Sequence, residues 1–401
     1  MSEWKTYRME DVAELCLGKM LDAKKNKGTL RPYLNNVSVR WGSFDLSDLP
    51  MMRFEDSEIE RYVARKGDIV ACEGGEPGRC AMWKSDTPIF LQKAVHRIRV
   101  KKGFDPCFVY YDFRYLVTSG KTAHLETGST IRHLPGQALK EVELAIPDLP
   151  TQRCIAAVLG ALDDKIENNR KICENLEAQA QALFKSWFVD FEPWGGKMPE
   201  GWKKGKLRDI AGYDNRRIAA SNLTVETYFS TENMLTDRGG VVAAASIPQS
   251  GEVPLCEEGS VLVSNIRPYF KKIYRATETA GHSADVLCFE AKDSSWQWYL
   301  YRLLWDDAFF AYVMSGVKGC KMPRGDKEQI LDYGCVIPGA DNVAEFNAVV
   351  EPMCQRITHC NKESRALAEM RDALLPQLML GRLRVDATAC QGEIDVGKVE
   401  I

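Results

Sequence analysis

Apolar residues recur at alternating spacings of four and three positions in two long segments of the chain. The first run is Ile155, Leu159, Leu162, Ile166, Asn169, Cys173, Leu176, Ala180, Leu183 and Trp187. The second run is Phe346, Val350, Met353, Ile357, Cys360, Ser364, Leu367, Arg371, Leu374 and Leu378. We call each run a seam. A period of about 3.5 residues predicts helices that each bury one narrow stripe against another helix. We therefore predict paired helices over residues 152–190 and 343–378.

Several residues in these segments make the prediction more specific. The polar residues that interrupt the two seams are Asn169, Ser364 and Arg371. We expect the stem of Arg371 to pack in its seam while the guanidinium group reaches solvent. Pro352 is expected in the first turn of the second helix, where an N–H has no partner anyway. Gly195 and Gly196 are expected to end the first helix, and Pro376 the second.

Both seams belong to a longer internal repeat. The segment GSTIRHLPGQALKEVELAIP (128–147) aligns without gaps to GCKMPRGDKEQILDYGCVIP (319–338), at an offset of 191 residues. The same offset superimposes the two seams. Further upstream, WKTYRMEDVAEL (4–15) resembles WKKGKLRDIAGY (202–213). Matching segments in the same order indicate an internal duplication.

Chain order then predicts how the two copies are connected. The first helix carries the chain from the first copy into the second, and the second helix follows the second copy. If each copy has its ends close together, the second helix runs back along the first as an antiparallel coiled coil. One globular unit then lies at each end, and the pair has a pseudo-twofold axis. The alternative is a buried helix pair inside one compact domain.

The segments outside the seams predict an α+β fold. Short alternating or β-branched runs between turn residues predict strands at 7–15, 67–75, 79–84, 94–100, 259–265, 271–276 and 283–291. Helices are predicted at 107–116 and 296–313, and core packing rather than base stacking is favoured for the aromatic residues of the latter. The fold class is therefore α+β, with two duplicated target-binding domains separated by an antiparallel two-helix coiled coil. The boundaries are 1–150 for the first domain, 151–195 for its helix, 196–342 for the second domain, 343–385 for its helix, and 386–401 for an acidic tail without fixed structure.

Composition excludes several classes of protein. A chain of 401 residues exceeds what one core usually serves, and its 45% hydrophobic and 27% charged content is ordinary for a folded protein. The 13 cysteines show no C-x-x-C spacing, which favours reduced thiols over a disulfide framework or structural zinc. We see no secretory signal and no run of apolar residues long enough for a membrane span, so we expect a cytoplasmic protein.

Charge is unevenly distributed although the net charge is only −3. The segments LQKAVHRIRVKKG (91–103) and SNIRPYFKKIYR (264–275) are basic and contain no acidic residue. Local basic faces on an acidic protein fit a partner of limited footprint, such as a short length of DNA. The alternative is a strand edge carrying solvated Lys and Arg. Charge alone leaves both interpretations open.

Catalytic motifs are missing from the sequence. The tetrapeptide SGKT (119–122) lacks the upstream glycine of a phosphate-binding loop, because Tyr115 stands there. The run GGEPGR (74–79) lacks dinucleotide-site spacing, and the five histidines show no metal-binding or triad spacing. What remains is binding of a ligand with two separated sites. Duplex DNA is such a ligand, and two divergent copies predict two different half-sites.

At this point the residues resemble a known family. The segment LPTQRCIAAVLGALDDKIENNRKICENLEAQAQALFKSWFVDFEPW (149–194) is similar to the central region of type I restriction–modification specificity subunits. The segment 370–385 resembles their distal region, and 127–134 and 92–99 resemble segments of their target-recognition domains. The resemblance covers about residues 1–385. It implies a non-catalytic subunit that reads a bipartite, asymmetric DNA target.

The resemblance also implies partners and cofactors. Two modification (methyltransferase) subunits and restriction (ATP-dependent translocase and nuclease) subunits are expected to assemble with this chain. S-adenosylmethionine, ATP and Mg²⁺ then belong to those partners, and this chain is expected to hold no metal. Docking of the modification subunits is expected at Phe184, Trp187, Phe188 and Phe191.

Basic and other polar residues of the two domains are the candidate DNA contacts. In the first domain they are Lys93, His96, Arg97, Arg99, Thr130, Arg132 and His133. In the second domain they are Asn265, Arg267, Lys271, Lys272, Lys321 and Arg324. Two other functions compete with DNA reading. An enzyme acting alone would need a cofactor motif, and a protein-only coiled-coil scaffold with two binding heads would leave the basic segments unexplained.

Overall fold

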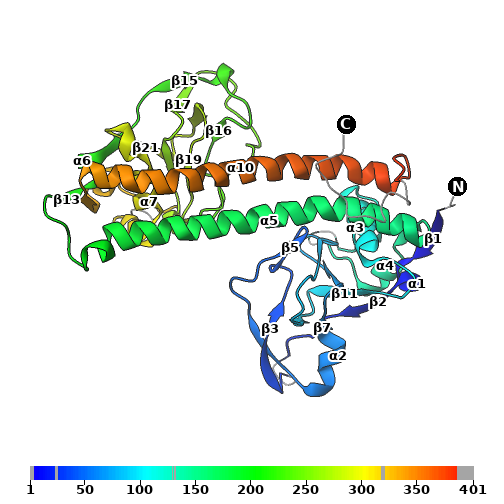
Figure 1. Ribbon diagram of the computed structural model, residues 1–401. Helices are drawn as coiled ribbons and strands as arrows, with labels where there is room; N and C mark the ends of the chain where they lie inside the picture. Colours follow the sequence, from blue (N-terminus) through cyan, green and yellow to red (C-terminus); the bar gives the residue numbers. More distant parts are fainter. Residues whose placement is uncertain (1–3, 23–25, 129, 131, 318–320, 386–401) are drawn as a thin grey trace. The chain divides into compact units, whose positions relative to one another are not determined.

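The computed structural model describes residues 4–22, 26–128, 130, 132–317 and 321–385 (Figure 1). The predicted acidic tail lies outside them. The chain forms two compact units, unit 1 with residues 1–168 and 363–401, and unit 2 with residues 169–362. None of the described helices combines the length and the apolar character that a membrane crossing needs.

Unit 1 is built on two four-stranded sheets. Its strands are β1 (Lys5–Arg8), β2 (Ala13–Leu17), β3 (Thr29–Leu34), β4 (Val39–Arg40), β5 (Ser43–Phe44), β6 (Met51–Phe54), β7 (Val63–Ala64), β8 (Ile69–Cys72), β9 (Cys80–Met82), β10 (Ile89–Leu91), β11 (Val95–Val100) and β12 (Glu143–Ile146). Its short helices are α1 (Met9–Val12), α2 (Ile59–Tyr62), α3 (Pro106–Thr118) and α4 (Gly136–Lys140). One sheet has the antiparallel order β2-β11-β8-β9, and the other has the order β6-β3-β10-β7 with β3 and β10 parallel. Strands β1 and β12 pair separately.

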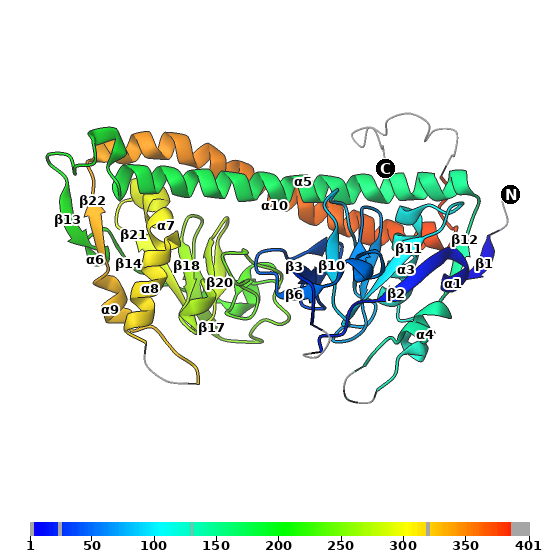
Figure 2. The ribbon, with the colours of Figure 1, turned by 90° about the horizontal axis from the view of Figure 1, so that it is seen from below.

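Unit 2 also contains two four-stranded sheets, one of which has the same strand order as in unit 1. Its strands are β13 (Lys203–Lys206), β14 (Ala211–Tyr213), β15 (Arg217–Ala219), β16 (Tyr228–Phe229), β17 (Glu252–Cys256), β18 (Val261–Ser264), β19 (Ile273–Arg275), β20 (Ala280–His282), β21 (Val286–Ala291) and β22 (Gly334–Ile337). Its short helices are α6 (Leu207–Ile210), α7 (Gln297–Trp305), α8 (Asp307–Ser315) and α9 (Lys327–Leu331). The sheets have the orders β14-β21-β18-β19 and β15-β17-β20-β16, the latter with β16 and β20 parallel. Strands β13 and β22 pair beside α6 (Figure 2).

Helix α3 forms the centre of the core of unit 1. The Asp105 side chain accepts a hydrogen bond from the N–H of Phe108 at 3.0 Å, and Pro106 occupies the first turn. An N-cap followed by proline is a strong helix start. Phe108 and Phe113 are fully buried in the same cluster as Ile98 of β11. The predicted helix at 107–116 is therefore confirmed and is slightly longer.

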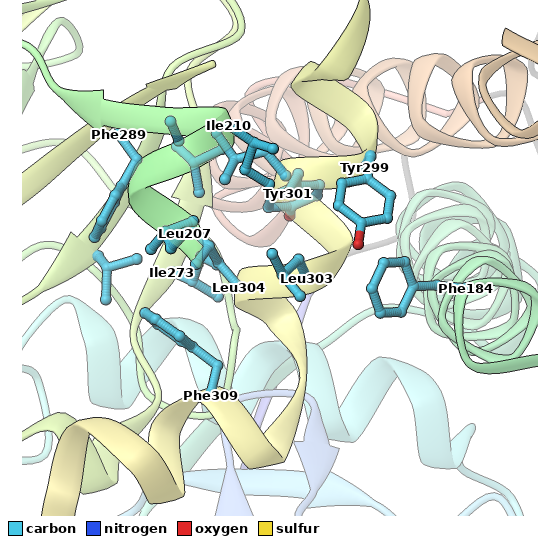
Figure 3. Close-up of a cluster of buried hydrophobic side chains, with 14 of the residues drawn as sticks. Phe184, Leu207, Ile210, Ile273, Phe289, Tyr299, Tyr301, Leu303, Leu304 and Phe309 are labelled. Atoms are coloured by element: carbon cyan, nitrogen blue, oxygen red, sulfur yellow. The ribbon is translucent and has the colours of Figure 1, made fainter. Parts of the chain in front are cut away.

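The predicted helix at 296–313 is divided into α7 and α8. The break lies at Asp306, which has extended backbone and accepts a hydrogen bond from the N–H of Ala308 at 2.8 Å. A capping aspartate starts a new helix, and the continuous helix was wrong for this reason. The preference for core packing is confirmed. Tyr299 of α7 is buried and faces Phe184, with ring centroids 5.4 Å apart (Figure 3).

Two long helices occupy the predicted seams, α5 (Leu149–Phe188) and α10 (Ala340–Met379). In each unit they lie side by side and antiparallel (Figure 1). In unit 1, Asp163 of α5 pairs with Arg371 of α10 at 2.6 Å. In unit 2, the side-chain amide of Asn169 donates to the carbonyl of Cys360 at 3.4 Å, and these residues are 191 positions apart. From one contact to the other, the residue number rises in α5 and falls in α10, as expected for antiparallel helices.

A short helix of each unit is tied to these long helices by a polar side chain. In unit 1, the Tyr111 hydroxyl of α3 donates to the Asp163 carboxylate of α5 at 2.8 Å. In unit 2, Arg302 of α7 is fully buried, pairs with Glu177 of α5, and lies 3.0 Å from the Cys354 sulfur of α10. Tyr111 and Arg302 are also separated by the repeat offset. The equivalent positions of the two units therefore both link a short helix to the long helices, one through a hydroxyl group and the other through a guanidinium group.

Four sequence expectations about the helices need correction. The Arg371 side chain is only 13% exposed, and its guanidinium group pairs with Asp163 instead of reaching solvent. Pro352 lies inside α10, not in its first turn, and the helix continues because its neighbouring seam residues are buried. Helix α5 ends at Phe188, before the two glycines. Helix α10 continues past Pro376 to Met379, since proline blocks a helix at the residues before it rather than after it.

The cysteines that the structure describes are free thiols. Many are buried, and burial raises the pKa of Cys256 to about 12. A protonated thiol in an apolar core behaves as a small hydrophobic side chain.

Candidate nucleic-acid interface

Two loops of unit 1 lie against each other. One is the turn between β8 and β9, residues 73–79, and the other contains residues 127, 128, 130 and 132–134. Gly74 of the first loop forms a β-bridge with His133 of the second. A Cβ atom on Gly74 would lie 2.5 Å from Nδ1 of His133, so any other residue at this position would displace the His133 ring. We call this pair of loops tip 1.

Tip 1 exposes three of the predicted DNA contacts, Thr130, Arg132 and His133. The second loop is narrow, because the backbones of Thr127 and His133 exchange hydrogen bonds of 2.8 and 2.9 Å. The Arg132 side chain is 66% exposed and lies 3.6 Å from the carboxylate of Glu126. An exposed pair of this kind is weak, so the guanidinium group stays accessible to an anion.

Lys93 lies on the turn between β10 and β11, and its side chain is exposed. The carbonyl of the next residue, Ala94, accepts a hydrogen bond from the N–H of Glu73 in tip 1 at 2.9 Å. This turn is therefore attached to the same loops, and Lys93 belongs to the candidate interface.

His96 lies in the interior of unit 1. It is 1% exposed, and its Nε2 lies 3.1 Å from the carbonyl oxygen of Leu134, at the end of tip 1. Burial lowers the pKa of the imidazole, so the ring is neutral at neutral pH and donates one hydrogen bond. His96 supports the tip from beneath, and a DNA duplex cannot reach it in this conformation.

Arg97 and Arg99 lie on the same strand and are also engaged within unit 1. The Arg97 guanidinium is buried and donates to three backbone carbonyls, the nearest being Val63 at 2.9 Å. Arg99 forms two hydrogen bonds of 2.8 and 2.6 Å with the buried carboxylate of Asp68. These contacts stabilise the sheet, and we therefore leave both arginines out of the candidate interface.

Unit 2 builds the same arrangement from corresponding segments. The turn between β18 and β19, residues 265–272, lies against residues 321–325, and we call this pair of loops tip 2. Ile266 forms a β-bridge with Arg324. In the repeat, Arg324 corresponds to His133, which makes the equivalent bridge in tip 1. The two units therefore present loops with the same construction and different side chains.

Tip 2 exposes three of its predicted DNA contacts. Arg267 and Lys321 are exposed. Arg324 has a side chain that is 53% exposed and lies 3.0 Å from the carboxylate of Asp285. This pair is close to solvent, so a phosphate group could compete for the arginine.

The other three predicted contacts of tip 2 hold the loop itself. The Lys271 ammonium pairs with Asp307 at 2.8 Å, and the Lys272 ammonium donates to the carbonyl of Thr231 at 2.6 Å. Burial lowers the pKa of Lys272. Asn265 is buried, and within the described part of the chain its Oδ1 has no hydrogen-bond donor. The side chains of these three residues therefore mainly stabilise the conformation of tip 2 instead of forming its exposed surface.

Known proteins share both the sequence and the fold. Residues 1–178 match the family model described as the type I restriction modification DNA specificity domain. The type I restriction enzyme MjaIX specificity subunit of Methanocaldococcus jannaschii is 29% identical over 354 residues, covering 82% of this chain and 80% of that protein. The HindI specificity subunit of Haemophilus influenzae is 27% identical over 205 residues, covering 48% and 42%. Residues 1–178 thus match a type I restriction modification DNA specificity domain, and most of the chain is similar in sequence to a type I restriction enzyme specificity subunit.

A solved structure agrees in fold. The crystal structure of the type I restriction–modification S subunit from M. genitalium aligns over 94% of this chain and 96% of that chain, with a TM-score of 0.56 and 17% identity. At this level of identity the likeness concerns the fold alone.

The docking residues expected of a specificity subunit pack against this chain. Phe184 and Phe188 are 1% and 2% exposed in the core of unit 2, and the Phe188 ring stacks on Trp202 with centroids 5.6 Å apart. Trp187 and Phe191 are partly buried against the same cluster. Only the latter two retain surface that a partner could contact, and docking at this site stays a prediction.

One cluster of possible metal ligands occurs in the described part of the chain. Asp214, Cys288 and Glu290 bring ligand atoms within 4.8 Å of one another. Burial raises the pKa values of Cys288 and Glu290, which favours their protonated forms, and Asp214 is paired with Arg216 at 2.7 Å. Asp214 and Glu290 thus have polar partners within unit 2, Arg216 and Ser260.

The sequence predicts charged contacts at tip 2 but does not single out two apolar residues that the structure exposes there. Tyr269 is 47% exposed and Met322 is 50% exposed. Both carry a signal in the sequence. Tyr269 lies within the basic segment 264–275, and Met322 aligns in the repeat with Ile131, which lies outside the described residues.

Proposed function

We propose that this chain is the DNA-reading, non-catalytic subunit of a type I restriction–modification complex, and that tips 1 and 2 each read one half of a bipartite, asymmetric target. The supporting observation is that both units build the same pair of loops and expose basic side chains on them. Phosphate contacts would supply affinity, and base edges would supply sequence. Because the side chains of the tips differ, the half-sites would differ as well.

We also propose that the units arose by duplication and that α5 and α10 form an antiparallel coiled coil with pseudo-twofold symmetry. The sheet orders β2-β11-β8-β9 and β14-β21-β18-β19 correspond strand by strand and support the duplication. The contact between Asn169 and Cys360 supports the symmetry, because these residues are 191 positions apart. A residue meets its own counterpart only beside a twofold axis.

The similarity to type I restriction enzyme specificity subunits supports a proposal about partners. Two modification (methyltransferase) subunits and restriction (ATP-dependent translocase and nuclease) subunits would assemble with this chain. They would supply S-adenosylmethionine, ATP and Mg²⁺, and the complex would act on DNA in the cytoplasm.

The test uses the complex with modification subunits and a duplex whose target sequence has been mapped from methylated adenines. Lysine usually holds phosphate, whereas arginine is the commonest reader of base edges. Lys321→Ala is therefore expected to weaken binding to all duplexes alike and to lower the salt slope by about one. Arg267→Ala is expected to cost about 1–3 kcal/mol on the cognate duplex and to relax one base position.

Lys197→Ala, at an exposed lysine outside the tips, is the matched control and should bind as the wild type does. Wild-type binding by both tip variants would remove the tips from the interface. A wild-type complex that binds no duplex at low salt would favour the protein-only scaffold with two binding heads.

A further inference from the structure

Tip 2 exposes two apolar side chains among basic residues. Tyr269 and Met322 are about half exposed, and Arg267 and Lys321 lie close to them in the chain. Tyr269 is also the one exposed aromatic side chain among the residues that the structure describes. Leaving apolar surface in water forgoes about 25 cal/mol per Å² of burial. An exposed apolar pair inside a proposed binding surface therefore points to contact with an apolar group of the ligand.

The backbone of tip 2 holds Tyr269 in one place. Arg267 and Lys271, on either side, have left-handed φ values of 50° and 48°, which residues with a Cβ rarely adopt. The N–H of Arg267 donates to the carbonyl of Pro323 at 2.8 Å, and the carbonyl of Lys271 accepts from the N–H of Arg238 at 3.0 Å. These hydrogen bonds maintain a conformation that the chain would otherwise leave.

The equivalent turn of tip 1 has different chemistry. Residues 73–79 read Glu-Gly-Gly-Glu-Pro-Gly-Arg and contain no aromatic residue. The carboxylate of Glu76 accepts a hydrogen bond from the indole N–H of Trp41 at 2.7 Å and pairs with Arg79 at 2.8 Å. The exposed ring is therefore a property of tip 2 and distinguishes the two units.

We propose that Tyr269 and Met322 make an apolar contact with the bases of the half-site that unit 2 reads, and so help to determine its sequence. This inference rests on the proposed function. Apolar side chains in a DNA groove contact the methyl group of thymine or wedge between base-pair steps. Neither interaction involves phosphate, so the pair contributes to discrimination between sequences and not to general affinity.

The experiment compares Tyr269→Ala, Met322→Ala and the double variant in the complex with modification subunits. The double variant is expected to bind the cognate duplex about tenfold more weakly, with unchanged affinity for an unrelated duplex and an unchanged salt slope. Lys321→Ala is the contrasting control, because loss of a phosphate contact weakens both duplexes and lowers the slope. Tyr269→Phe keeps the ring and retains the cognate preference.

Two DNA probes distinguish the forms of apolar contact. Deoxyuridine in place of thymine in the second half-site removes the methyl group and weakens wild-type binding if that group is contacted. A 2-aminopurine base in the same half-site gains fluorescence on binding if a side chain unstacks a base step. Either response supports the proposal, and it should disappear in the double variant.

Thermal unfolding of each variant controls for folding, and both side chains are exposed enough for the variants to unfold as the wild type does. A double variant with the wild-type ratio of cognate to unrelated affinity overturns the inference, whether both affinities fall together or neither changes. Failure of the wild-type complex to bind any duplex refutes the proposed function instead.

Discussion

Asp112 is a carboxyl group in the interior of unit 1. It is 2% exposed on α3 and accepts a hydrogen bond from the backbone of Ala145, while its Oδ2 has no partner within the described residues. Burial raises the pKa of Asp112 to about 7. A carboxyl group with this pKa keeps its proton in the folded protein at pH values where the unfolded chain has lost it.

This difference predicts a specific pH dependence. The folded pKa is above the unfolded value of about 3.9, so the contribution of Asp112 to stability is full below about pH 4 and is lost as the pH rises through 7. Asp112→Asn mimics the protonated form. It is expected to raise the free energy of unfolding at pH 8 by up to about 4 kcal/mol and to have little effect at pH 4.

Thermal unfolding measured between pH 4 and pH 8 checks this expectation. The matched control is Asp86→Asn, because the Asp86 side chain is 87% exposed beside Lys66. A variant at position 112 whose unfolding temperature shows the pH dependence of the wild type would contradict the argument.

The contacts made by the basic residues of strand β11 could not be predicted from the sequence. The basic residues of this strand are evident in the sequence, but their partners are distant. His96 contacts a carbonyl 38 positions away, and Arg97 contacts carbonyls 34 to 37 positions away. No local pattern indicates which segment will cover a strand. Exposed tip residues such as Arg132 and Arg267 were predictable because turn residues flank them.

At the scale of elements, α5 and α10 are held by a buried ion pair as well as by their seams. Arg371 and Asp163 pair at 2.6 Å with side chains that are 13% and 16% exposed. Asp163 also accepts the hydroxyl hydrogen bond of Tyr111. Removing one member of a buried pair is costly mainly because the other charge loses its partner.

Arg371→Leu is therefore expected to lower the free energy of unfolding by about 2–4 kcal/mol. The double variant Asp163→Asn with Arg371→Leu removes both charges, so it should recover part of this loss. Denaturant unfolding of both single variants and the double variant gives the coupling energy. Additive effects of the two substitutions would show that the pair does not hold the helices together.

The two helices were predictable because helix geometry imposes the apolar period on every turn. Their ends were not predictable to the same degree. Pro352 and Pro376 are local stop signals, but both lie within α10, where burial of seam residues such as Val350 and Leu378 outweighs a lost hydrogen bond. Apolar periodicity thus reports on the helix interior, and tertiary packing decides where each helix ends.

At the scale of the whole molecule, both long helices pass from one unit to the other. The boundary falls between residues 168 and 169 in α5 and between 362 and 363 in α10. If the tips read two half-sites, the proposed coiled coil sets the gap between them. The internal repeat predicts two copies, and the structure forms two compact units whose boundaries fall inside the long helices rather than at their ends.

Matched insertions at these boundaries test whether the two helices set the gap between the half-sites. Four residues inserted after Asn168 and four after Lys362 add about 6 Å of helix at 1.5 Å per residue, which is close to two base-pair steps of 3.4 Å. A four-residue insertion rotates each seam only slightly, so the helices should still pair. The variant is expected to methylate the same two half-sites with a gap that is longer by one or two base pairs.

An insertion in α5 alone is the control, because it places every later residue of α5 out of register with α10 and should reduce activity. Exchange of residues 1–150 for those of a relative should instead change one half-site and leave the gap unaltered. Genome-wide mapping of methylated adenines measures all three outcomes, and a doubly inserted variant that stays active on the original spacing would show that the helices do not set the gap.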